Sequence, residues 1–164
     1  MALLEKQLYI RKSTLPGAGR GLFTRKFIGK GTRIVEYIGE ILTWKEVEKM
    51  ADDRNGYVFY VNSKHVIDAW NYKKALARFA NDAKGVTRVK GIWTNAEYIV
   101  HKKRCYITAY RDIPAGSEIF VEYGAEYWQV IRYNLRLEQK SRALKEGEKI
   151  KLLHHKVAKR QKVH

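Results

Sequence analysis

Between Leu8 and Gly124 the apolar residues come in short runs that glycine, proline and polar turn residues separate. The runs are rich in β-branched and aromatic residues, which favour strands, and they are too short for helices. Segments 16–21 and 113–116 contain the strongest turn signals, because each combines proline with glycine. The expected strands are 8–10, 22–24, 33–42 with an interruption at Gly39, 57–61, 65–70, 98–100, 105–110 and 118–123. This pattern predicts a mostly β (α+β) body made of several small sheets.

Within this body the sequence predicts two short helical segments. Thr43 and Glu46 have the spacing of a capping box, in which each residue satisfies backbone groups at the start of a helix. We expect that helix to end near Asp53 and a second helical turn to cover 73–79. Residues 82–94, which include two glycines, are expected to form a loop or a weak hairpin.

The C-terminal part of the chain has a different pattern. From Glu126 onward apolar residues recur at helical spacing, and Gly147 predicts a break between two helical pieces. The sequence therefore predicts a catalytic domain over residues 1–125 and a basic, amphipathic helical extension over residues 126–164.

Length and composition limit the class of protein. A chain of 164 residues suits one domain with a short appendage, and no apolar run approaches the length of a membrane span. Charge appears at Glu5 and Lys6, too early for a secretory signal, and the single cysteine, Cys105, excludes internal disulfides and cysteine-rich zinc clusters. We expect an intracellular protein without membrane contact, in the nucleus if the source is eukaryotic or viral and in the cytoplasm if it is prokaryotic.

Net charge is the strongest feature of the composition. The chain carries a formal charge of +16, and residues 138–164 contribute nine Lys/Arg against three Glu, a net of +6. A charge of this size favours acidic partners such as nucleic acid. We therefore expect nucleic-acid contact through the basic surface and tail, while the sequence leaves the oligomeric state open.

Four segments carry the functional information. They are 19–23 (GRGLF), 36–40 (EYIGE), 77–82 (ARFAND) and 118–124 (EIFVEYG). Each one alone has an ordinary structural interpretation, such as a tight turn, a strand or a capped helix end.

In this order the four segments resemble those of SET-domain protein lysine methyltransferases, which read GxG, YxG, RFxNHSxxPN and ELxxDYG. Segments 67–69 and 106–116 add to the resemblance, which covers roughly 8–128. It implies a SET-type fold of several small curved β-sheets, with the last strand threaded under the loop after Asn81 and followed by C-terminal helices. Because this chain lacks the cysteines of flanking zinc modules, it resembles a minimal form of the family.

The resemblance implies S-adenosylmethionine as the cofactor and no metal. The matching cofactor-binding positions are Gly19, Arg20, Gly21, Tyr37, Arg78, Phe79, Asn81, Tyr123 and Trp128. Glycine lets backbone amides approach a ligand closely, and Asn81 matches the asparagine that anchors the cofactor, although an asparagine here could also cap a helix. For Trp128, stacking on adenine and anchoring the C-terminal helix are equal alternatives.

The resemblance also implies a channel for the substrate lysine, with Tyr123, Tyr37 and Tyr98 as catalytic residues. Tyr37, Tyr98, Val121 and Tyr123 match its lining. Aromatic walls suit the apolar lysine stem, and an apolar channel beside a sulfonium lowers the pKa of the amine, so no dedicated base is needed. Tyr123 would orient the amine toward the methyl group.

Three departures from the family pattern stand close together. Asp82 replaces the usual histidine, the following cysteine is absent, and the loop 83–94 is longer than in relatives. His154 and His155 are adjacent, so on a helix they point about 100° apart and cannot easily share a metal.

These features predict a protein lysine N-methyltransferase whose partner is a lysine-containing protein, with histone tails or DNA-associated proteins as the leading substrate class. Two alternatives remain at this stage. One is a SET-like domain that lost catalysis through Asp82 and binds nucleic acid or chromatin, and the other is an architectural nucleic-acid-binding protein that matches the motifs by chance.

Overall fold

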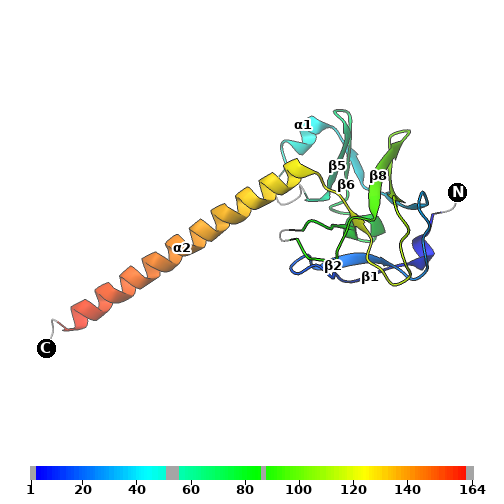
Figure 1. The fold of residues 1–164 in the computed structure, drawn as a ribbon. Helices are drawn as coiled ribbons and strands as arrows, with labels where there is room; N and C mark the ends of the chain where they lie inside the picture. The colour runs from blue at the N-terminus through cyan, green and yellow to red at the C-terminus, as the bar shows by residue number, and fades with distance from the viewer. Residues whose placement is uncertain (1–2, 51–55, 86–87, 162–164) are drawn as a thin grey trace. The chain divides into compact units, whose positions relative to one another are not determined.

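The computed structural model describes residues 3–50, 56–85 and 88–161 (Figure 1). The chain divides into two compact units, Met1–Glu122 and Tyr123–His164. The first unit contains all the described strands, and the second contains one long helix.

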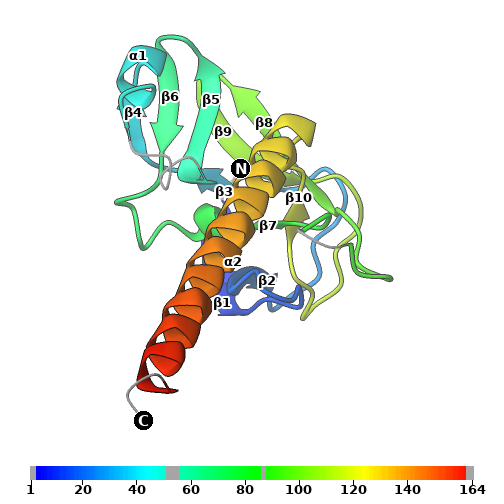
Figure 2. The same ribbon diagram turned by 90° about the vertical axis from the view of Figure 1, so that its left-hand side faces the viewer.

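The described strands form four small sheets, as the short apolar runs predict. Two antiparallel sheets have three strands: β3 (Arg33–Tyr37), β9 (Arg104–Ala109) and β8 (Ala96–His101) in one, and β4 (Glu40–Leu42), β6 (His65–Asp68) and β5 (Val58–Asn62) in the other. The third pairs β1 (Leu8–Lys12) with β2 (Arg20–Thr24) in antiparallel register. The fourth pairs β10 (Phe120–Val121) with β7 (Asn81–Asp82) in parallel register, and Figure 2 shows these two strands side by side.

The core of the first unit lies where these small sheets meet. Its largest fully buried apolar side chains come from separate strands and from the segments between them: Leu22, Phe23, Ile28, Ile34, Val66, Ile107, Ile113, Ile119 and Val121. Burying a side chain of this size stabilises the fold by about 1.5–3 kcal/mol relative to leaving it in water. The core therefore depends on contacts between strands far apart in the sequence.

Strand β10 is held from both ends of the loop that follows Asn81. On one side Phe120 and Val121 pair with Asn81 and Asp82. Beyond the loop, the Asn95 amide donates to the Glu118 carbonyl at 2.8 Å and accepts from the Phe120 N–H at 2.8 Å. The chain thus passes the last strand beneath the loop, which agrees with the SET-type fold that the sequence predicts, although the strand is shorter than the predicted 118–123.

The short helical segments begin where the sequence places them or slightly later. Helix α1 (Trp44–Val47) has the predicted capping box, in which the Glu46 carboxylate accepts from Thr43 N at 2.7 Å and Thr43 Oγ1 at 2.8 Å. The helix ends at Val47 and residues 48–50 form turns, so the predicted end near Asp53 is wrong. The second segment is a 3₁₀ helix, η3 (Leu76–Phe79), and not a turn from residue 73. A further 3₁₀ turn, η1 (Glu5–Gln7), precedes β1.

The C-terminal unit corrects the predicted break at Gly147. Helix α2 runs without interruption from Ala125 to Gln161, so one helix replaces the expected two pieces (Figure 1). A glycine inside a helix costs about 1 kcal/mol relative to alanine, and the strong helix formers on both sides of Gly147 outweigh that cost.

The described part of α2 also lacks the expected amphipathic face. Leu135 and Leu144 are nine positions apart, which turns them to about opposite sides of a helix, and Leu144 is 70% exposed. Within the described residues, α2 and the other helices are all too short or too polar to cross a membrane.

Candidate active site

The glycines of segment 19–21 have two different structural roles. Gly19 has a φ of +70°, a left-handed conformation that favours glycine, and a Cβ there would meet nothing within 4 Å. At Gly21 a Cβ would lie 2.0 Å from Oε1 of Glu118. Gly21 is therefore required within the protein itself, because any larger residue would clash with the Glu118 carboxylate.

Asn81 joins this loop to the end of the first unit. It lies in β7, one residue beyond the C-cap of η3, so the alternative of a helix-capping asparagine is wrong. Its Nδ2 donates to the Arg20 carbonyl and to Glu118 Oε1, each at 3.1 Å. Two of the segments recognised in the sequence, at 19–21 and at 81, therefore meet through one side chain.

Glu118 is a site residue that the sequence analysis did not single out. Its side chain is only 4% exposed and accepts hydrogen bonds from Ser13 and Thr14 as well as from Asn81. The available signal was a carboxylate in an otherwise apolar run, because such a residue is buried only when polar partners surround it.

The Phe79 ring has cation–π contacts with two arginines, Arg20 of the glycine loop and Arg78, and we call this group the layered contact. The Arg20 guanidinium lies 4.8 Å from the Phe79 ring centroid, and the Arg78 guanidinium lies 5.6 Å from it. Arg78 also donates from Nη1 to the Trp70 carbonyl at 3.0 Å. These contacts fix the arginine in place, which is a positioning role.

The predicted channel residues Tyr37 and Tyr98 are in contact in the structure. Their ring centroids are 5.9 Å apart, and Phe59 lies 6.0 Å from Tyr37 and 5.0 Å from Tyr98. The sequence analysis missed Phe59, because this residue lies in a different sheet from Tyr37 and Tyr98 and meets them only where the two sheets contact each other. The three rings form an aromatic wall of the kind that an apolar lysine stem requires.

The hydroxyl of Tyr37 is already engaged. It donates to the Tyr57 carbonyl at 3.0 Å, and burial raises the pKa of Tyr37 above the ordinary value of tyrosine. The phenol therefore stays protonated at neutral pH and serves as a fixed donor. The Arg78 guanidinium lies 4.3 Å from the Tyr57 ring centroid, which links the aromatic wall to the layered contact beside the loop.

Val121 and Asp82 are paired residues of β10 and β7. Both are buried, at 0% and 2% exposure. Asp82 Oδ1 accepts from the Lys84 N–H at 2.8 Å, so this carboxylate stabilises the first turn of the long loop. Asp82 therefore supports the loop by accepting a hydrogen bond from its backbone, whereas a histidine, the usual residue of the family pattern at this position, could support it by donating one.

Tyr123 and Trp128 belong to the second unit, where they form a cluster with Tyr127. The Tyr123 and Trp128 rings are stacked at 6.1 Å with an interplanar angle of 15°, and Tyr127 meets Tyr123 at 4.8 Å. These contacts fix the first turn of α2 to the residue that matches the last family motif.

Comparison with known proteins agrees with this arrangement. Residues 19–124 match the SET domain family. A variant-silencing SET domain-containing protein of Plasmodium falciparum (isolate 3D7) is 31% identical over 132 residues, which are 74% of this chain and 5% of that protein. The histone-lysine N-methyltransferase EZH2 of Chaetomium thermophilum is 31% identical over 134 residues, 74% of this chain and 8% of that protein.

A solved structure shows the same fold. It is a humanized mutant of the Chaetomium thermophilum Polycomb Repressive Complex 2 bound to the inhibitor GSK126, with a TM-score of 0.59 and 28% identity over 75% of this chain and 15% of that one. The chain thus spans a small fraction of the length of these relatives. The family match covers most of the first unit and includes the glycine loop, Asn81 and the last strand. The chain belongs to the SET domain family.

Proposed function

We propose that this chain transfers a methyl group from S-adenosylmethionine to a lysine side chain of a protein, with histone tails as the leading substrate class. Similar proteins are named histone-lysine N-methyltransferases. The observation that carries the proposal is the junction of Gly21, Asn81 and Glu118, because it joins three segments that match family motifs in order. A histone substrate would place the protein in the nucleus of a eukaryotic cell.

The residues around Asn81 fit the proposed cofactor. A ligand with an amino-acid end needs an acceptor for its ammonium group and open backbone nearby. Asn81 uses Nδ2 within the protein, which leaves Oδ1 for a ligand, and the space at the Cα of Gly19 is open within 4 Å. When bound, S-adenosylmethionine supplies an electrophilic methyl group on a sulfonium.

The aromatic wall of Tyr37, Phe59 and Tyr98 would hold the lysine stem and exclude water from its amine. Desolvation lowers the pKa of an amine, which favours the neutral form that can attack. Tyr37 cannot act as a base at neutral pH, because it is protonated and donates to the Tyr57 carbonyl. By its match to the last family motif, Tyr123 is assigned the role of orienting the amine.

Cofactor binding should stabilise the folded protein. At a hundredfold excess over the dissociation constant, S-adenosylmethionine is expected to add about 2.7 kcal/mol of stability and to raise Tm by about 5–10 °C. Asn81→Ala should remove most of this shift because it deletes the proposed acceptor. Differential scanning fluorimetry with and without the cofactor measures both effects.

Asn62→Ala is the matched control for this experiment. Asn62 caps a turn between β5 and β6 by accepting from the Lys64 N–H at 3.0 Å, and it lies in a different sheet from Asn81. This variant should keep the full shift. An unchanged Tm of the unmutated protein at millimolar cofactor would contradict both the enzyme and the inactive SET-like alternative.

The exposed cations of α2 support a second proposal, that the extension contacts nucleic acid. Between residues 138 and 151 of the helix they are Lys140, Arg142, Lys145, Lys149 and Lys151. Replacing all five with glutamine should flatten the dependence of DNA affinity on salt, by up to about 4 units in the log–log slope. Fluorescence anisotropy with duplex DNA at several salt concentrations measures the slope.

Two exposed lysines of the first unit, Lys45 and Lys64, provide the comparison. Their replacement with glutamine should change the slope less than the replacements in α2. An unchanged slope in the α2 variant would assign the binding to the basic first unit.

A further inference from the structure

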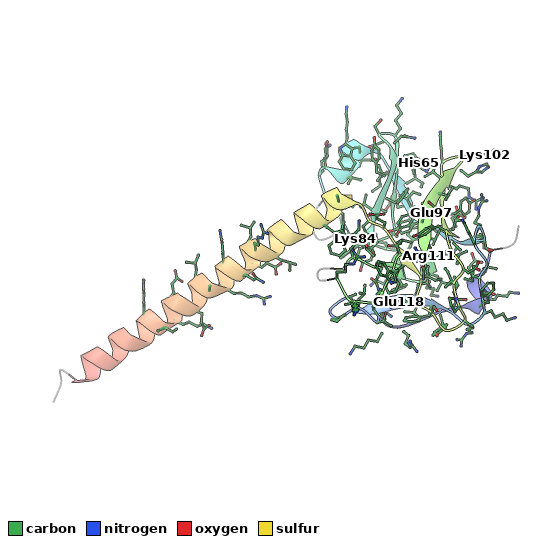
Figure 3. The ribbon with its side chains drawn as sticks, in the orientation of Figure 1. His65, Lys84, Glu97, Lys102, Arg111 and Glu118 are labelled. Carbon is green, nitrogen blue, oxygen red and sulfur yellow. The ribbon has the colours of Figure 1, made fainter. Side chains whose placement is uncertain are left out.

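A buried carboxylate organises the segments that the proposed cofactor would contact. Glu118 lies inside the first unit close to β1 and β2 (Figure 3). Its Oε1 accepts from Ser13 Oγ at 2.7 Å and Asn81 Nδ2 at 3.1 Å, and its Oε2 accepts from Thr14 N at 2.8 Å and Thr14 Oγ1 at 2.7 Å. All four groups can donate, which matches a carboxylate that only accepts.

These contacts determine which atom of Asn81 faces a ligand. The two neighbours of its Nδ2, the Arg20 carbonyl and the Glu118 carboxylate, are both acceptors. Rotating the amide by 180° would place Oδ1 against these two acceptors, which is unfavourable. The amide orientation is therefore fixed by chemistry, and Oδ1, which has no hydrogen bond within the described part of the chain, remains as an acceptor.

The charge on Glu118 also favours a particular ligand group. Among the described residues, Glu118 forms no ion pair with a lysine or arginine, so its buried charge is balanced by hydrogen-bond donors. Because the negative charge of Glu118 lies next to Asn81, Oδ1 of Asn81 should bind a cationic ligand group more strongly than it binds a neutral hydroxyl group.

We propose that Glu118 is a positioning residue that holds Asn81 with Oδ1 presented to the α-ammonium group of the cofactor. Ser13 and Thr14 fix the carboxylate, and the missing Cβ of Gly21 makes room for it. This assignment rests on the proposed function, since it takes S-adenosylmethionine as the ligand.

The test compares two ligands that differ only in the ammonium group. S-adenosylhomocysteine carries it, and the deaminated analogue of S-adenosylhomocysteine lacks it. Isothermal titration calorimetry on the unmutated protein should give an affinity about ten- to a hundredfold higher for the first, the effect of one charge-assisted hydrogen bond. In Glu118→Ala this preference should fall severalfold, because the Arg20 carbonyl alone then opposes rotation of the Asn81 amide and the carboxylate charge is gone.

Glu46→Gln is the matched control. Glu46 also accepts from a threonine N–H and from its Oγ1, but it does so at the start of α1. It should keep the full preference. A general loss of stability would weaken both ligands equally and leave their ratio unchanged, so the ratio separates positioning from a structural role.

Each result decides a different point. If the unmutated protein binds neither ligand, the proposed function fails together with this assignment. If it binds both ligands equally, the role of Asn81 Oδ1 is wrong while cofactor binding stands. If Glu118→Ala keeps the preference, the positioning role is overturned. If Glu118→Ala shows no cooperative melting transition, Glu118→Gln replaces it in the test, because glutamine preserves the side-chain volume but has one oxygen where Glu118 uses two. A reduced preference for S-adenosylhomocysteine in this variant supports the positioning role. An unchanged preference overturns it.

Discussion

Replacing Tyr123 with phenylalanine is expected to lower kcat about a hundredfold or more while leaving cofactor affinity nearly unchanged. The substitution removes one hydroxyl and keeps the ring that packs on Tyr127 and Trp128. A group that orients the amine in the transition state, without holding the cofactor in the ground state, affects kcat and not cofactor binding. Mass spectrometry of a methylated histone peptide gives the rate, and calorimetry gives the affinity.

Tyr60→Phe is the control for that experiment. Tyr60 is 55% exposed on β5 and packs against Trp44. It should leave both quantities unchanged. A near-normal rate in Tyr123→Phe would move the orienting role to another hydroxyl, and Tyr98 would then be the first to test.

Replacing Gly21 with alanine is expected to lower the free energy of unfolding by about 2–3 kcal/mol and Tm by about 5–10 °C. The added methyl group would lie 2.0 Å from Glu118 Oε1 and 3.3 Å from Asn81 Nδ2, so the carboxylate has to move. Its displacement breaks hydrogen bonds to Ser13 and Thr14 and leaves buried donors unpaired. Urea unfolding followed by circular dichroism measures the loss.

Two comparisons isolate the steric cause. Gly17→Ala adds a methyl group in open space at a φ of +77°, so only backbone strain of about 1 kcal/mol is expected there. In a Glu118→Ala background, Gly21→Ala should cost much less than in the unmutated protein, because the clashing oxygen is gone. Equal losses in both backgrounds would show that the carboxylate is not the cause.

Features that depend on neighbouring residues were predictable from the sequence. The capping box at Thr43 and Glu46 needs residues only three positions apart, and the turns need only glycine and proline. Most strands were placed correctly for the same reason, because the alternation of apolar residues is local. The resemblance of four ordered segments then supplied the fold.

Features that depend on distant contacts were not predictable. Glu118 binds Ser13 across 105 positions and Asn81 across 37, and nothing near Glu118 in the sequence indicates these partners. Phe59 reaches Tyr37 and Tyr98 only after two sheets have formed. The continuity of α2 through Gly147 is a third case, because the sum over a whole helix outweighs one unfavourable residue.

The pairing of β10 with β7 has a consequence for the order of folding. Strand β10 pairs with residues 39 positions earlier in the chain, and Glu118 closes still longer loops to Ser13 and Thr14. Closing loops of this length lowers the entropy of the chain before the new contacts stabilise it, so such pairings form slowly and late. During synthesis on the ribosome, β1, β2 and the Asn81 strand emerge well before Glu118, and Asn81 then lacks one of the two acceptors that fix its amide. A nascent chain therefore gains the folded geometry around Asn81 only when nearly all of the first unit has been made.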